Sequence, residues 1–183
     1  MKIAVYCSAK DTIPAEYLAL GEMLGTWIGN QGDTLVYGGA TGGLMSRTSE
    51  AVHAAGGHVI GVIPPCIIAA GRLASNCNEL INVANMSERK QQMRDLADVI
   101  VCLPGSYGTL DEMLDATSSA IVGEHNKLLF VVNYNGFYEP LKQQLEHMRE
   151  LSFIPNEECY KPIFVDSLDE LYNCINNLKR IKI

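Results

Sequence analysis

The sequence predicts a three-layer α/β domain in which helices flank a mostly parallel sheet. Seven short apolar runs, rich in β-branched residues, read as near-continuous hydrophobic segments, which is typical of strands buried on both faces. Helix-like stretches separate most of these runs, and that alternation is the pattern of a parallel sheet. Glycine clusters follow several runs, at the strand ends where such sheets bind their ligands.

The predicted elements follow one another without a linker, an internal repeat or a low-complexity segment, so residues 1–183 are expected to form a single domain. The strand-like runs are residues 2–7, 34–39, 58–65, 79–85, 98–105, 127–133 and 161–166. The helix-like stretches are residues 14–32, 43–57, 87–98, 109–123, 136–151 and 167–181. The first of them begins with Pro14 and closes near Gly32, as helix start and stop signals predict. Residues 64–80 are the least regular and are expected to form a long connection or lid.

Composition indicates a globular protein and argues against several partners. Apolar residues make up 48% and charged residues 19% of the chain, its net charge is -7 and its pI is about 5.0. Nucleic acid and anionic membranes both require a positive surface, so neither is expected as a partner. No apolar run approaches the length of a membrane span. The six cysteines form no CxxC pair, and a disulfide framework is not expected at this length without an export signal, so the expected compartment is a reducing cytoplasm. His53 and His58 lack a third ligand at useful spacing, so no metal site is expected.

The first glycine-rich stretch is "VYGGATGGLMSR", residues 36–47. Gly42 and Gly43 let the backbone turn sharply and approach a ligand, and the following helix directs its N–H groups toward that point. The spacing is not that of the dinucleotide fingerprint, because Ala40 stands where the second glycine belongs. Tight turns between a strand and a helix are the alternative interpretation.

The second stretch is "LPGSYGTLDE", residues 103–112, where a predicted strand meets a predicted helix. Backbone N–H groups and two hydroxyls at a helix N-terminus suit a phosphate, and no lysine follows at the P-loop position. The candidate phosphate-binding residues here are Gly105, Ser106, Tyr107, Gly108 and Thr109. The alternative is a capping box, in which Thr109 caps the helix and Glu112 reaches back to it without any ligand.

The third stretch is "NMSERKQQMRD", residues 85–95. Arg89 and Lys90 lie in the first turn of a helix that Ser87 can cap, where a cation opposes the helix dipole at a cost of about 0.3–1 kcal/mol. A local rule broken in this way indicates function, and both side chains suit a phosphate. The alternative is a solvated basic face that includes Arg94.

Three carboxylates lie on the predicted helix at residues 109–123. Asp111 and Glu112 are neighbours that point about 100° apart, so both cannot face one substrate. Asp115 shares a face with Glu112, and we expect it to be solvated and not to orient Glu112.

Together these residues resemble the LOG (lonely guy) family, whose members are often mislabelled lysine decarboxylases. The family signature P-G-G-x-G-T-x-x-E corresponds to residues 104–112, and the upstream Arg-Lys pair corresponds to Arg89 and Lys90, closely following Met86. The resemblance covers nearly the whole chain, including "YCSAKD", "VYGGATGGLM" and "GGHVIGVIP". The chain departs from the family pattern at Ser106, where the family has a second glycine, and likewise at Ser87 and Ser46.

The resemblance implies a Rossmann-like fold, a homodimer with sites near the subunit interface, and a phosphoribohydrolase that needs no cofactor. Its substrate would be a nucleoside 5'-monophosphate, AMP or N6-prenylated AMP, cut to free base and ribose 5-phosphate. Arg89 and Glu112 would be catalytic. The substrate-binding residues would be Gly42, Gly43, Met86, Lys90, Gly105, Ser106, Tyr107, Gly108 and Thr109. A broader nucleotide nucleosidase and a non-catalytic nucleotide-binding or sensing module are the rival hypotheses.

Cleavage of a C1'–N bond passes through an oxocarbenium-like transition state with positive charge on the ribose. A carboxylate at Glu112 can stabilise that charge, bind ribose hydroxyls or activate water, and Arg89 can anchor the nucleotide or help the base depart. The helix that carries Glu112 also has more apolar residues than one face needs, including Leu114 and Ile121. Such a helix is expected to be buried in the core or against a second subunit.

Overall fold

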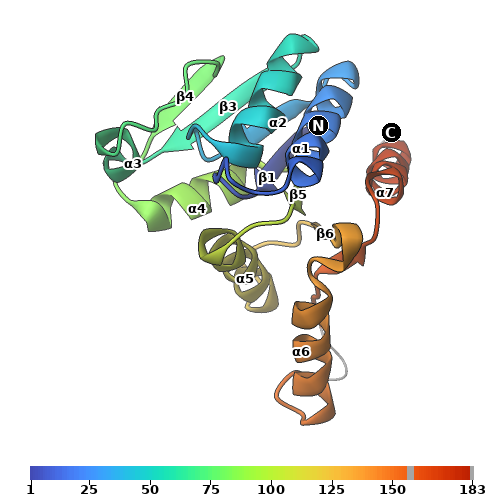
Figure 1. Cartoon of the computed structure of the whole chain (residues 1–183). Helices are drawn as coiled ribbons and strands as arrows, with labels where there is room; N and C mark the ends of the chain where they lie inside the picture. Colours follow the sequence, from blue (N-terminus) through green and yellow to red (C-terminus); the bar gives the residue numbers. More distant parts are fainter. Residues whose placement is uncertain (156–158, 182–183) are drawn as a thin grey trace.

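The computed structural model describes residues 1–155 and 159–181, and within them one sheet organises the molecule (Figure 1). Seven strands, all parallel, are arranged in the order β4-β3-β2-β1-β5-β6-β7. They are β1 (Lys2–Tyr6), β2 (Thr34–Tyr37), β3 (His58–Ile63), β4 (Glu79–Asn82), β5 (Val99–Cys102), β6 (Leu129–Val132) and β7 (Ile163–Val165). The predicted α/β fold with a mostly parallel sheet is confirmed, and every predicted strand lies within its predicted run.

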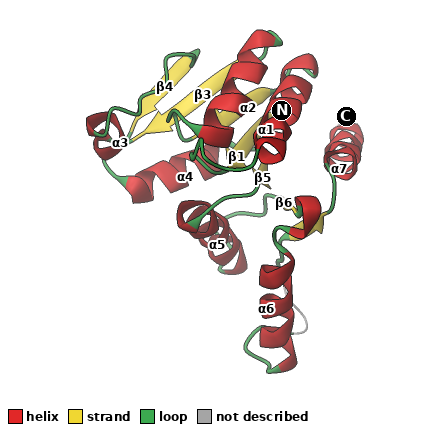
Figure 2. Cartoon of the chain, in the orientation of Figure 1, coloured by secondary structure: helices red, strands yellow, loops and turns green. Residues whose placement is uncertain are grey.

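Helices cover both faces of the sheet (Figures 1 and 2). On one face, α1 (Ala15–Asn30), α2 (Gly43–Ala54) and α7 (Leu168–Ile181) pack on Ile3 and Val5 of β1. On the other, α4 (Met86–Leu96), α5 (Tyr107–Ile121) and α6 (Glu139–Glu150) lie over Ala4 and Tyr6. Successive residues of a strand point to opposite faces, so a strand between two helical layers must be apolar throughout. In the described part of the chain, no helix has the length and apolar character needed to cross a membrane.

The chain reverses its direction of travel across the sheet between β1 and β5. The strands from β1 to β4 extend toward one edge, and α4 then returns the chain so that β5 pairs with the other side of β1. Tyr6 and Cys102 end these two strands side by side. Ligands of open α/β sheets bind at the carboxyl ends of strands where the order reverses in this way. The topology therefore places the candidate site beside the ends of β1 and β5.

Residues 64–80 form a connection that is fastened to this edge. It contains a short helix, α3 (Pro65–Ala69), which the sequence does not predict, and the beginning of β4, which lies within the predicted run 79–85. The Thr41 N–H donates to the Arg72 carbonyl at 2.8 Å, and the Ala74 N–H donates to the Gly39 carbonyl at 3.0 Å. These backbone hydrogen bonds attach the connection to the turn that follows β2. A one-turn 3₁₀ helix, η1 (Tyr134–Gly136), is likewise too short to leave a periodic signal.

Candidate active site

A buried ion pair joins α4 and α5 at the carboxyl edge of the sheet. Arg89 Nη1 donates to Glu112 Oε1 at 2.7 Å, and Arg89 Nε donates to the Val62 carbonyl of β3 at 3.2 Å. Each of the two charged side chains is only 5% exposed. Burying two charges has a large desolvation cost, so such a pair is weak evidence for stability and marks a candidate functional site. The structure thus brings together the two residues that the sequence predicts to be catalytic.

The carboxyl group of Glu112 has an unusual proton affinity. Burial raises the pKa of Glu112 to about 7, and Asp111 adds to this rise, whereas Arg89 and Lys90 oppose it. At neutral pH both the protonated and the ionised forms are therefore populated. A group whose pKa lies near the working pH is well suited to general acid–base catalysis.

The capping-box alternative for Glu112 is wrong. Helix α5 begins at Tyr107, so Ser106 is the N-cap residue and Thr109 already lies inside the first turn. Glu112 does not reach back to the cap, because its carboxylate faces Arg89 on the neighbouring helix. The helix begins two residues earlier than the sequence predicts, which moves every capping position.

The turn before α5 presents backbone donors to solvent. Ser106, Tyr107 and Gly108 are exposed, and the first N–H groups of any helix lack an intrahelical acceptor. Gly105 is needed for close packing, since a Cβ there would lie 2.0 Å from Thr109 Oγ1. Ser106 has φ -105°, which any residue adopts, so the serine that replaces the family's glycine strains nothing.

A small cavity of about 180 Å³ lies beside this turn. Gly105 and Ser106 form one wall, Ser8 and Lys10 from the end of β1 form another, and apolar side chains of α1 and the β6–α6 connection complete it. It is lined by Ser8, Lys10, Ile13, Pro14, Tyr17, Pro104, Gly105, Ser106 and Phe137. The cavity lies at the point where the strand order reverses.

Lys90 is not a free cation in this structure. Its Nζ lies 2.9 Å from Asp111 Oδ1 and 3.2 Å from Asp115 Oδ1, and Arg94 also bonds Asp115. Asp111 and Glu112 diverge as expected, one toward Lys90 and the other toward Arg89. The expectation that Asp115 is merely solvated is wrong, because it joins α5 to two cations of α4. A role for Lys90 in binding phosphate stays a prediction.

The cap of α4 is Asn85, not Ser87. Asn85 Oδ1 accepts hydrogen bonds from the N–H groups of Ser87 at 2.9 Å and Glu88 at 3.0 Å. Glu88 Oε2 in turn accepts from the Ala84 N–H at 2.6 Å. Met86 follows the cap and is 39% exposed, so it is accessible to a ligand. Asparagine is a preferred N-cap residue, and this signal was present in the sequence.

Gly42 and Gly43 pack the start of α2 against the loop that follows β1. The Gly43 N–H donates to Asp11 Oδ1 and the Gly42 N–H donates to Ser46 Oγ, both at 2.8 Å. Gly43 has φ +52°, and a Cβ there would lie 2.6 Å from the Lys10 nitrogen. Both N–H groups are therefore engaged by side chains, through Asp11 and Ser46, which the sequence did not single out as partners. A phosphate contact for these glycines stays a prediction.

The thiols near Glu112 are poor nucleophiles. Burial raises the pKa of Cys102 to about 12 and raises that of Cys7 well above its usual value. Because the thiolate is the reactive form, both cysteines are inert fillers at neutral pH. In the described residues, no group of three His, Cys, Asp or Glu side chains is placed to hold a metal ion.

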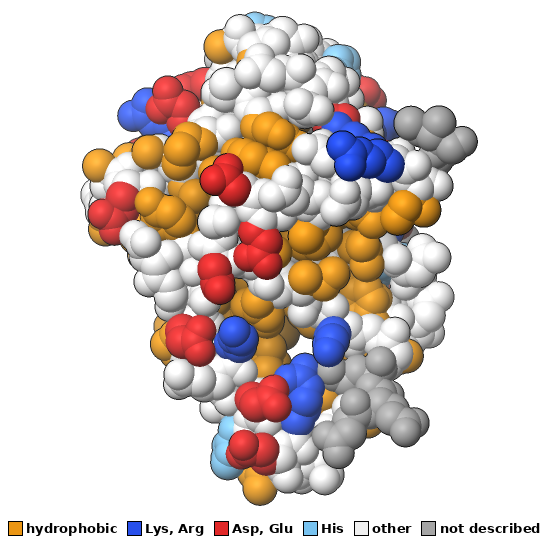
Figure 3. Space-filling model, turned by 90° about the vertical axis from the view of Figure 1, so that its right-hand side faces the viewer, with side chains coloured by type: hydrophobic (Ala, Val, Ile, Leu, Met, Phe, Trp, Pro, Cys, Tyr) orange, Lys and Arg blue, Asp and Glu red, His pale blue; other side chains and the backbone are white. Residues whose placement is uncertain are grey.

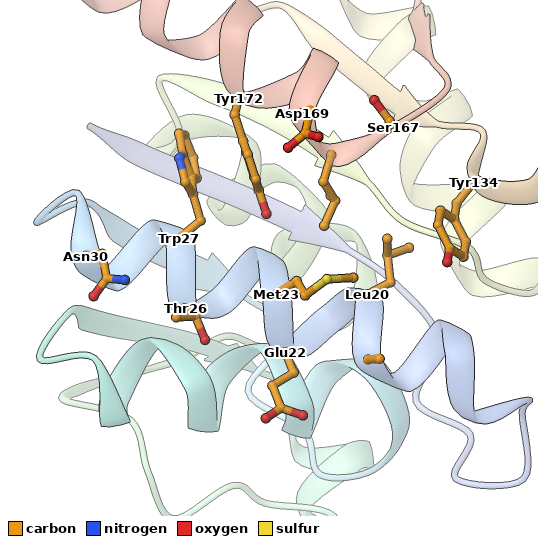
Figure 4. Close-up of a pocket in the computed structure, with 12 residues that line it drawn as sticks. Leu20, Glu22, Met23, Thr26, Trp27, Asn30, Tyr134, Ser167, Asp169 and Tyr172 are labelled. Atoms are coloured by element: carbon orange, nitrogen blue, oxygen red, sulfur yellow. The ribbon is translucent and has the colours of Figure 1, made fainter.

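A larger cavity, about 660 Å³, lies away from this site, between α1 and α7 (Figure 4). The rings of Trp27 and Tyr172 stack there at 4.4 Å, with Glu22 and Asp169 nearby. Figure 3 shows the face that carries α6 and α7, where hydrophobic side chains are interspersed with acidic ones. None of the predicted site residues lines this cavity, and it brings no buried ion pair to its walls. The candidate active site is therefore the Arg89–Glu112 region.

Comparisons with known proteins show the family of the chain. The family model described as "Possible lysine decarboxylase" matches residues 45–175. The chain is also 36% identical over 168 residues to the cytokinin riboside 5'-monophosphate phosphoribohydrolase of Mycobacterium marinum, which covers 92% of this chain and 89% of that protein. The chain belongs to the LOG family. A plant LOG-family relative, cytokinin riboside 5'-monophosphate phosphoribohydrolase LOG3 of Arabidopsis thaliana, is 35% identical over 153 residues, 84% of this chain and 71% of that one.

A solved structure has the same fold at lower identity. The molybdenum cofactor binding protein from Rippkaea orientalis superimposes with a TM-score of 0.70 and 21% identity, over 100% of this chain and 97% of that chain. At this identity the likeness shows the fold alone. The Rossmann-like arrangement of this LOG-family chain is thus shared with a protein of another name and role.

Proposed function

We propose that this LOG-family protein is a phosphoribohydrolase that cleaves the N-glycosidic bond of nucleoside 5'-monophosphates, AMP or N6-prenylated AMP. The products are the free base and ribose 5-phosphate. The observation that carries the proposal is the buried Arg89–Glu112 pair next to the exposed first turn of α5. The names of the curated relatives support the same reaction class.

In the proposed reaction, water adds to C1' of the ribose while the C1'–N bond breaks and its electron pair leaves with the base. Positive charge grows on the ribose in the transition state, and the Glu112 carboxylate stabilises it. A pKa of about 7 also lets Glu112 accept the proton that the attacking water loses. Arg89 holds this carboxylate in place and supplies a cation that anchors the nucleotide or assists departure of the base.

The phosphate is proposed to bind at the turn from Gly105 to Thr109. Exposed N–H groups at the start of a helix favour an anion, and the Ser106 hydroxyl adds a donor. Met86, Lys90 and the Gly42–Gly43 turn are proposed to complete the substrate site from the neighbouring elements. No metal or cofactor is required for this chemistry.

The decisive experiment is product chromatography after incubation of the purified protein with AMP, GMP, CMP and N6-isopentenyl-AMP. We expect free base and ribose 5-phosphate from AMP or its prenylated form. Equal release from all four nucleotides would instead identify a broad nucleotide nucleosidase. Release from none of them would contradict the proposal.

The alternative is a non-catalytic nucleotide-binding or sensing module. The departures from the family pattern at Ser106 and Ser87 are the observation in its favour. Such a module would bind AMP in a calorimeter but release no adenine over several hours. The buried pair at Glu112 favours the enzyme, because binding alone does not need a carboxyl group with a pKa near 7.

The enzyme is proposed to be a cytoplasmic homodimer without nucleic-acid or membrane partners. Helix α5 supports the dimer, since Met113 and Ala116 pack in the core while other apolar side chains stay outside. Leu114, Ile121 and Val122 are 44%, 50% and 74% exposed, respectively. Apolar residues beyond those that the core accepts indicate a surface for a second subunit. The six unpaired cysteines are consistent with a reducing compartment.

A further inference from the structure

Gly38, the buried residue directly after β2, lies in unusually close contact with the Arg89 side chain. A Cβ at this position would lie 1.5 Å from Arg89 Nη2 and 2.5 Å from its Cζ. The backbone of Gly38 does not adopt a left-handed φ, so its conformation does not require glycine. What requires glycine is the space taken by the guanidinium group.

The guanidinium cannot simply move away from Gly38. Its Nε is bonded to the Val62 carbonyl at 3.2 Å and its Nη1 to Glu112 at 2.7 Å, while the backbone of Gly38 supports its remaining edge. These contacts come from β3, α5 and the end of β2, and the side chain is only 5% exposed. Displacing the group at Gly38 must therefore lengthen or break a hydrogen bond elsewhere.

We propose that Gly38 is a positioning residue that seats the Arg89 guanidinium against Glu112. The activity readout of this inference rests on the proposed function, whereas its stability readout does not. In Gly38→Ala, the added methyl group displaces the Arg89 guanidinium, which weakens its hydrogen bond and ion pair with Glu112.

The effect of this displacement on the pKa of Glu112 depends on the groups that face its carboxyl group. They are Arg89 and Lys90 from α4, Asp111 on α5, Tyr6 and Cys7 at the end of β1, and Cys102 of β5. Burial raises the pKa values of the tyrosine and both cysteines, so these three stay neutral near pH 7. Arg89 is the strongest group that holds the Glu112 pKa down. Its displacement therefore raises that pKa further above 7.

The first experiment compares base release from AMP by the wild type and by Gly38→Ala from pH 5.5 to 9.5. We expect kcat of the variant to fall about fivefold at pH 7 and the acidic limb of its profile to move up by about one pH unit. Gly29→Ala is the matched control, because a Cβ at Gly29 would lie 2.5 Å from Ala55 Cβ near the opposite edge of the sheet. That variant should keep the wild-type pH profile even if its Tm changes.

A double-mutant cycle with Arg89→Lys separates positioning from general crowding. Lysine lacks Nη2, so Gly38→Ala should reduce kcat much less in the Arg89→Lys background than in the wild type. Equal losses in the two backgrounds would overturn the inference. If Gly38→Ala fails to fold, restoration of folding by Arg89→Lys supports the inference, and failure to restore it overturns it.

The pH dependence of unfolding tests the same contact without any activity. A raised carboxyl pKa contributes stability that is present below the unfolded pKa and lost as pH rises through the folded pKa. For the wild type that loss runs from about 4.5 to about 7, and in Gly38→Ala it should extend above pH 7. If the wild type releases no base yet this window shifts, the proposed function fails while the positioning role stands. An unchanged window and an unchanged pH profile would overturn the positioning role.

Discussion

Glu112 and Arg89 lie on two different helices and meet through a hydrogen bond of 2.7 Å in a site almost closed to water. The charge of the ionised carboxylate is opposed by burial and supported mainly by one guanidinium. Small changes around this pair therefore change how much of Glu112 is ionised near neutral pH. The proposed function of this site depends on that balance more than on the strength of any single contact.

Removal of the Glu112 charge tests its chemical role. Glu112→Gln keeps a side-chain oxygen that accepts from Arg89 but can neither stabilise a cation as well nor accept a proton. We expect base release from AMP to fall by at least about 100-fold, in line with the loss of a general acid–base group. Chromatographic rate measurements check this, with thermal unfolding as the control for folding. A variant as fast as the wild type would refute the catalytic assignment.

The pH dependence of the wild type follows from the same group. In the proposed mechanism the ionised form of Glu112 is the active one, so kcat should rise with pH through about 7 and then level off. The measurement is the initial rate of base release under saturating AMP in buffers of constant ionic strength. A rate that falls as the pH rises through 7 would show that the protonated form of Glu112 is the active form.

At the level of single residues, the sequence indicated which side chains lie in one region better than it indicated what each of them contacts. Arg89 and Glu112 are correctly brought together, but Lys90 faces Asp111 and Asp115. Motif spacing predicts that two residues lie in the same site. The partner that each side chain contacts depends on how helices α4 and α5 pack against each other. The contact between Gly38 and Arg89 leaves no sequence signal beyond a glycine pair after a strand.

Helices α4 and α5 are the elements that carry the site, and each has its first turn at the carboxyl edge of the sheet. Three ionic contacts between Lys90, Arg94, Asp111 and Asp115 run alongside the buried pair. Lys90, near the start of α4, would weaken an isolated helix, and both of its carboxylate partners lie on α5. The unfavourable position of a cation in the first turns of α4 is thus compensated by ion pairs with α5, in addition to its proposed functional role.

The cap of α4 gives a direct test of the corrected helix start. Asn85→Ala removes the acceptor for two N–H groups and should lower the free energy of unfolding by about 0.5–2 kcal/mol. Ser87→Ala, two residues later, removes no cap and should change it by less than about 0.5 kcal/mol. Urea unfolding of both variants makes the comparison. A larger loss of unfolding free energy in Ser87→Ala than in Asn85→Ala would show that Ser87 is the N-cap residue, as the sequence predicts.

Strand prediction succeeded at the element scale because every central strand is buried on both faces and so leaves a continuous apolar run. Helix bounds were less accurate, as at α5, because a cap depends on which residue leaves the helical conformation. The short helices α3 and η1, of five residues or fewer, were missed since they have no periodicity to detect.

At the scale of the whole molecule, the apolar outer face of α5 predicts its association. Ile121→Glu adds a charge to a residue that is half exposed in the single chain, so it should leave the fold intact and disrupt the dimer. Light scattering at micromolar concentration should give a dimer mass for the wild type and a monomer mass for the variant. Thr26→Glu, at an exposed position of α1 on the other face of the sheet, gives the matched control for added charge. A monomeric wild type would contradict the proposed dimer.

By itself, the sequence determined the fold class, the order of strands and helices, the family, and the two residues that meet at the candidate site. These features can be predicted from local patterns, because apolar runs, glycine turns and motif spacings are properties of residues that are close in the sequence. Only the tertiary structure decided that Glu112 pairs with Arg89 and not with its own helix cap, that Lys90 is already neutralised, and that Gly38 supports the guanidinium. Such contacts join residues far apart in the chain, so they exist only once the helices have packed on the sheet at a particular depth.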